Sequence, residues 1–144
     1  MYILEMKRLL SLLLIMLLTI NCSKDADESL SQELVPIVSV NLPDGLKTGQ
    51  TYEFDVLYKK TSNCHYFSGF DVSKNENTII VGVVNSYNSI NNNCPSNRNI
   101  QETAKLNFVV EREDFYIFKF WQGKSSVGED KFLTKEVPII PPEN

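Results

Sequence analysis

Between Val35 and Ile140 the apolar side chains recur mostly at every second position, which is the period of a β-strand with one buried face. The clearest example is the segment from Thr51 to Lys60. Apolar or aromatic side chains there occupy alternate positions, namely Tyr52, Phe54, Val56 and Tyr58. Charged residues occupy most positions between them, namely Glu53, Asp55 and Lys59. This alternation predicts a strand with one face in the core and one in water.

Other segments have the same strand character and are separated by turns rich in Pro, Gly, Asn and Asp. The segment Thr78–Val84 is β-branched almost throughout, which indicates a strand buried on both faces, and Gly82 within it indicates a bulge or a close approach. The remaining expected strands are 35–42, 64–72, 103–110, 115–121 and 131–140. Short strands at this spacing, with almost no helical period, predict an all-β, antiparallel sandwich of about seven strands.

The segment Asn85 to Asn99 is rich in Asn and Ser and contains Pro95, so it is expected to be a long loop. Because long loops on rigid sandwiches often carry binding residues, Tyr87 in this segment is a candidate partner contact. Trp121, beside the Gly123 turn, is the second candidate, since exposed Tyr and Trp commonly anchor recognition surfaces. A mobile loop without function and a packed tryptophan at a strand end are the alternatives.

The N-terminus follows a different pattern, apolar and without period. Lys7 and Arg8 precede the segment Leu9 to Ile20, about twelve mostly apolar residues, whereas a membrane-spanning helix needs about 20. A basic start followed by a short apolar stretch predicts a secretory signal peptide rather than a permanent span. Met6 begins the usual Met-Lys-Arg pattern, so Met1 and Met6 are both candidate start residues.

The apolar segment ends in Leu18-Thr19-Ile20-Asn21-Cys22, which resembles the lipobox of bacterial lipoproteins, with Asn21 where Gly, Ala or Ser is most common. The resemblance implies cleavage before Cys22 and a diacylglycerol on its thiol, which would hold the protein on a membrane. The acidic stretch Ser23 to Ser29 is expected to be a flexible tether. It also resembles the export signal of Bacteroidota lipoproteins of the outer membrane, which favours display on the cell surface over a periplasm-facing position.

The chain contains three cysteines. Once Cys22 is assigned to lipid, Cys64 and Cys94 remain as an even pair in an oxidising compartment, and we predict a disulfide between them. Two free thiols are the alternative. Closing a loop of about thirty residues should stabilise the domain by roughly 3 to 4 kcal/mol.

Three segments carry a resemblance to bacterial immunoglobulin-like domains: Gly49–Val56, Asp114–Phe118 and Glu136–Ile139, which look like strands B, F and G. The resemblance implies that Tyr116 acts as a tyrosine corner. Phe118 stands where the second cysteine of an antibody domain would be, so the implied inter-sheet disulfide of those domains is absent. The expected organisation is a signal peptide over 1–21, a lipidated cysteine with its tether over 22–34, and an immunoglobulin-like β-sandwich domain over 35–144.

Residues for catalysis or metal binding are sparse. His65 is the only histidine, so copper or zinc sites built from several histidines are not expected, and a catalytic His65 next to an oxidised Cys64 is not expected either. The acidic clusters 25–28 and 111–114 lack the spacing of a calcium loop and are interpreted as solvated charge. We therefore predict no enzyme activity, no metal and no cofactor.

The net charge of −4 makes nucleic acid an unexpected partner, since phosphate binding needs a clustered basic face. The expected function is a lipid-anchored, non-enzymatic envelope module, monomeric as a domain, for adhesion, binding or structural support. Its partners would be the membrane, through the lipid, and a protein or glycan ligand. The alternative is a protease-inhibitor-like or chaperone-like accessory that presents its sandwich loops to a client.

Overall fold

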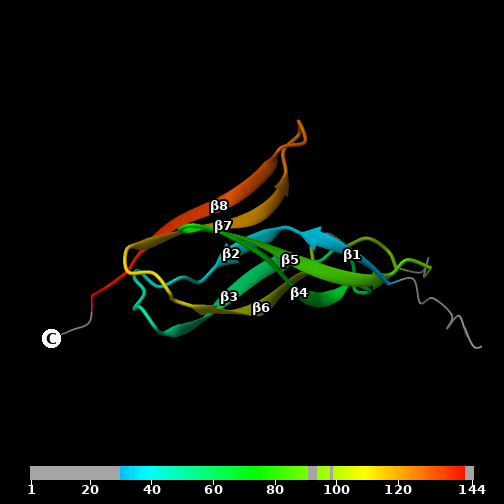
Figure 1. Cartoon of the computed structure of the whole chain (residues 1–144). Coiled ribbons are helices and arrows are strands. Elements are labelled where there is room, and N and C mark those ends of the chain that lie inside the picture. The colour runs from blue at the N-terminus through cyan, green and yellow to red at the C-terminus, as the bar shows by residue number, and fades with distance from the viewer. Residues whose placement is uncertain (1–29, 91–93, 98, 142–144) are drawn as a thin grey trace, which may run out of the picture.

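The computed structural model describes residues 30–90, 94–97 and 99–141, and in this part the chain is all-β, with eight strands in two sheets (Figure 1). The strands are β1 (Leu30–Val35), β2 (Ile37–Val40), β3 (Thr51–Lys59), β4 (Tyr66–Asn75), β5 (Thr78–Asn88), β6 (Gln101–Val109), β7 (Phe115–Lys124) and β8 (Asp130–Pro138). No stretch of these residues forms a helix of the length and hydropathy that crossing a bilayer requires. The predicted all-β sandwich is confirmed.

The two sheets differ in width. In the five-stranded sheet β5 is central: β4 pairs with one of its edges, and β1 and β7 share the other edge, with β8 beyond β7. The three-stranded sheet has the order β2-β3-β6. All pairs are antiparallel except β5 with β7, which run parallel from Thr78↔Ile117 to Val81↔Phe120. This parallel pair departs from the antiparallel expectation and from the antiparallel sheets of immunoglobulin domains.

The N-terminal boundary of the domain was predicted wrongly. Strand β1 begins at Leu30 rather than at residue 35, so residues 30–34, expected in the tether, form a strand that pairs with β5. Pro36 then interrupts the single strand expected over 35–42, because proline lacks the N–H that a continuing ladder needs. The chain leaves the large sheet at Pro36 and enters the small sheet as β2.

Strand β5 is buried on both sides near its centre, as its β-branched sequence predicted. Val81 and Val83 face the core, and Gly82 faces outward beneath Leu34 of β1. A Cβ on Gly82 would lie only 2.8 Å from Leu34 Cδ2, so the glycine permits this close approach, one of the two roles predicted for it.

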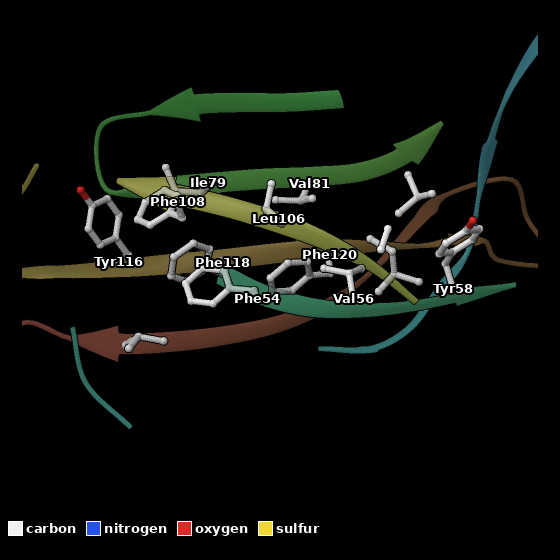
Figure 2. Close-up of a cluster of buried hydrophobic side chains, with 14 of the residues drawn as sticks. Phe54, Val56, Tyr58, Ile79, Val81, Leu106, Phe108, Tyr116, Phe118 and Phe120 are labelled. Atoms are coloured by element: carbon white, nitrogen blue, oxygen red, sulfur yellow. The ribbon is translucent and has the colours of Figure 1, made fainter. Parts of the chain in front are cut away.

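The core lies between the two sheets and is largely aromatic (Figure 2). The ring of Phe118 on β7 packs edge-on against those of Phe54 on β3 and Phe108 on β6, with ring centroids 5.7 Å and 5.1 Å apart. Edge-to-face pairs of this kind contribute about 0.5–1.5 kcal/mol beyond their buried area. The predicted inward positions of β3 therefore meet side chains of β6 and β7 in one cluster.

Tyr116 forms the corner implied by the resemblance. Its side chain is buried, and its hydroxyl oxygen accepts hydrogen bonds from the backbone N–H groups of Glu111 (3.0 Å) and Arg112 (3.1 Å). These bonds fix the connection between β6 and β7 against the start of β7.

Candidate functional site

The disulfide between Cys64 and Cys94 is formed, with Cα atoms 5.8 Å apart, which confirms the predicted pairing. It joins the β3–β4 connection to the β5–β6 connection. Both connections lie at the end of the sandwich where β1 begins, because Leu30 pairs with Asn88 and Tyr66 with Ser86. We call this the β1 end.

A hydrogen-bonded network centred on His65 lies beside the disulfide. The His65 ring is buried, with Nδ1 2.7 Å from Ser62 Oγ and Nε2 3.3 Å from Glu33 Oε1. Ser62 Oγ also accepts the backbone N–H of Cys64 (3.1 Å), and Glu33 Oε1 accepts the Thr61 hydroxyl (2.5 Å). The network connects β1 to the disulfide-bonded connections.

One tautomer of neutral His65 satisfies these contacts: the Ser62 hydroxyl donates to Nδ1, and Nε2–H donates to Glu33. A serine, a histidine and a carboxylate are also bonded in this order in hydrolytic triads, but there the serine contacts Nε2 and the carboxylate contacts Nδ1. Here Ser62 contacts Nδ1 and Glu33 contacts Nε2. Ser62, however, is only 1% exposed, whereas a nucleophile must bring its oxygen within about 3–3.5 Å of a substrate atom. In this arrangement the network fixes the local fold rather than presenting a nucleophile.

Asn85 lies next to this network in the interior. In register it is opposite Glu33 of β1 and Phe67 of β4, on the core-facing side of β5. Its side chain is completely buried, and neither Oδ1 nor Nδ2 has a hydrogen-bond partner among the described residues. Such a group costs about 1–3 kcal/mol of stability.

Tyr87, the first candidate contact, lies on β5 and not in a loop, because that strand continues to Asn88. The expected loop from Asn85 was therefore placed four residues too early. The Tyr87 ring is half-buried and packs on the His65 ring, with 4.5 Å between the ring centroids. The ring therefore packs against the His65 network rather than extending from a loop into solvent.

Trp121, the second candidate, is half-buried on the outer face of the large sheet, where it pairs with Phe132 of β8. Its Nε1–H donates to Asp130 Oδ1 (2.9 Å), which also accepts Lys124 Nζ (3.0 Å). These two bonds, the one from Trp121 first, lower the pKa of Asp130. Trp121 and Tyr87 lie on opposite faces of the large sheet, so the structure does not bring them together.

At the opposite end of the sandwich lies a cleft of about 560 Å³, lined by Lys47, Glu113, Ile139 and neighbouring residues. Small-molecule sites are usually lined by apolar side chains with a few convergent polar groups. The lining of this cleft is instead a mixture of charged, polar and apolar residues. Within the described ranges no three His, Cys, Asp or Glu side chains gather as metal ligands would. Cys22, the predicted lipid attachment site, lies outside these ranges.

The sequence did not reveal the partnership of Glu33 with His65, since 32 positions separate them. The Ser62 to His65 spacing of three residues within a turn was the only local signal of the network. No protein-family model matches the chain, and neither the curated proteins nor the solved structures compared with it contain a match.

Proposed function

We propose that this chain is a lipid-anchored, non-enzymatic binding module of the cell envelope, attached through Cys22 and displayed on the outer surface of the outer membrane. The observation that carries the proposal is the short distance along the chain between the lipobox-like cysteine and the folded domain. Strand β1 begins at Leu30, eight positions after Cys22. Eight residues span at most about 29 Å, so the lipid would hold the β1 end close to the membrane.

The arrangement of the β1 end supports a structural use of its polar groups. The disulfide and the His65 network brace the connections nearest the proposed anchor. Because His65 and Ser62 have their hydrogen-bonding atoms occupied by each other and by neighbours, they support a binding or structural role over catalysis. Partner binding would then use the strands and faces that extend away from the membrane.

Mass analysis of the protein from its native membrane, combined with protease treatment of intact cells, tests the anchor and its side. We expect a diacylglycerol-modified N-terminal Cys22 and loss of the domain to external protease. The matched control is Cys22→Ser, which should be secreted or retained without lipid. An unmodified Cys22 would reject the anchor, and a lipidated protein that is cleaved only after the outer membrane is opened would reject surface display.

A further inference from the structure

In the described part of the chain both edge strands of the small sheet, β2 and β6, lack a second partner, and β6 is the longer of the two. Within that part, β6 pairs only with β3, over nine consecutive residues without a bulge, from Thr51↔Val109 to Lys59↔Gln101. The backbone N–H of Val110 donates to the carbonyl of Gln50, and that of Lys60 donates to the carbonyl of Ile100. The backbone N–H and C=O groups of the even-numbered residues of β6 therefore point towards β3. By alternation, the backbone N–H and C=O groups of the odd-numbered residues, Thr103, Lys105 and Asn107 among them, point to the open edge.

Three of the other edge strands carry features that discourage pairing. Strand β2 has four residues and a register shift, and β4 has a bulge between Phe67 and Gly69. Strand β8 carries Lys131, Lys135 and Glu136 along its exposed length. Lys105, the charged residue in the middle of β6, does not block the addition of a strand to this edge. Its Nζ lies over β3, where it donates hydrogen bonds to Glu53 (2.7 Å) and Asp55 (3.0 Å).

The large sheet extends beyond this open edge. In Figure 2, Leu106 and Phe108 of β6 lie over Ile79 and Val81 of β5, while β4, the green strand at the top, lies further out. Because opposite residues of an antiparallel pair share a face, Phe67, Phe70 and Val72 of β4 face inward with Asn85, Val83 and Val81.

Two of these inward-facing side chains, Phe67 and Val72, are nevertheless exposed, whereas Phe70 is half-buried against the core. Phe67 is 38% and Val72 is 40% exposed, although Phe67 continues the core through its ring contacts with Tyr58 (6.2 Å) and Phe70 (5.1 Å). The contact of Lys74 Nζ with the Phe108 ring (5.7 Å) places the far end of β4 above the far end of β6. The apolar strip Phe67-Phe70-Val72 thus lies where a fourth strand of the small sheet would cover it.

From this geometry we propose that β6 accepts one extended segment of a partner protein as a fourth strand, whose inward side chains cover the strip Phe67-Phe70-Val72. The open backbone groups specify an extended segment, and the apolar strip specifies apolar side chains at alternate positions. An ion pair lies at each end, Lys60–Glu102 and Lys74–Glu111, so the segment would have polar ends. The inference deepens the proposed binding function and rests on it.

A second copy of the chain does not fit this position by pairing β6 with β6 about a twofold axis. Strand β4 lies further out than β6 in Figure 2, so this pairing would bring the large sheets of the two copies against each other on the same side of the joined small sheets. The occupant is therefore a single extended segment.

The test uses the purified full-length chain in mild detergent and a fluorescent nine-residue peptide, Lys-Thr-Val-Thr-Val-Thr-Val-Thr-Glu. We expect saturable binding by fluorescence anisotropy and at least tenfold slower amide exchange at Thr103, Lys105 and Asn107. Val72→Asp, which places a charge under the added strand, should weaken binding at least tenfold. The matched control is Val109→Asp, the same change on the outer face of β6 at a residue 50% exposed, and it should leave binding unchanged.

Asn107→Pro removes an N–H that points to the open edge while leaving the β3 ladder intact, and it should also weaken binding. To exclude low affinity of the free peptide, the same segment is fused after Asn144 through a Gly/Ser linker, which raises its effective concentration to the millimolar range. Unchanged exchange at Thr103, Lys105 and Asn107 with both the free and the fused segment would overturn the proposal. So would binding that Val72→Asp and Val109→Asp affect equally. Neither result depends on the lipid on Cys22, which the mass analysis and protease treatment test. Failure of the strand-addition proposal is therefore distinguishable from failure of the proposed anchor.

Discussion

Removing the hydroxyl of Tyr116 tests whether the corner before β7 stabilises the fold. In Tyr116→Phe the backbone N–H groups of Glu111 and Arg112 lose their common acceptor, while the buried ring keeps its packing against Phe108 at 5.0 Å. A hydrogen bond contributes about 0.5–1.5 kcal/mol net, so losing two should lower the free energy of unfolding by about 1–3 kcal/mol. Water can reach the partly exposed corner, which favours the lower half of that range.

The matched control is Tyr52→Phe, since within the described residues the Tyr52 hydroxyl accepts one backbone N–H, that of Lys47 at 3.0 Å, at an exposed position. It should cost less than about 1 kcal/mol. Urea unfolding followed by the fluorescence of Trp121, the only tryptophan, gives both free energies. If Tyr116→Phe costs no more than Tyr52→Phe, the corner does not hold the connection as inferred.

Three further predictions concern stability. Replacing both Cys64 and Cys94 by Ser should lower the free energy of unfolding by roughly 3–4 kcal/mol, since the disulfide closes a separation of 30 residues; a loss below about 1 kcal/mol in urea titrations would contradict this. Asn85→Val should raise the free energy of unfolding by about 1–2 kcal/mol, because it removes two buried polar atoms without partners; a thermal melt showing destabilisation would mean that the amide has a partner. The hydrogen bond from Arg112, followed by that from the Phe115 N–H, lowers the pKa of Asp114 from its ordinary 3.8 to about 2. A depressed folded-state pKa contributes stability above the unfolded pKa that is lost as the pH falls through the folded one. Asp114→Asn should therefore be less stable than the parent at pH 6, with a deficit that shrinks as the pH falls towards 2, and a deficit of unchanged size at pH 2 in urea titrations would contradict the assignment.

The sequence alone determined where most strands lie and which side chains face inward. Alternation over β3 predicted its core positions correctly, because a strand side chain's face depends only on its place in a two-residue period. The even cysteine pair predicted the disulfide, and the resemblance to immunoglobulin-like domains implied the tyrosine corner at Tyr116. These features depend on local periodicity, on cysteine counting or on a short segment.

Only the tertiary structure decided how the strands are ordered and which edges stay open. Pro36 gave a local reason for a break, but the transfer of the chain from one sheet to the other depends on pairing with β5 and then with β3. Glu33 and His65 meet because β1 joins the large sheet, and no periodicity records that contact. Phe67 and Val72 have the pattern of core residues, yet they remain exposed because the small sheet has only three strands in the described part of the chain. The face of a strand on which a side chain lies depends on the local sequence. Whether another strand shields that side chain from solvent depends on segments distant in sequence.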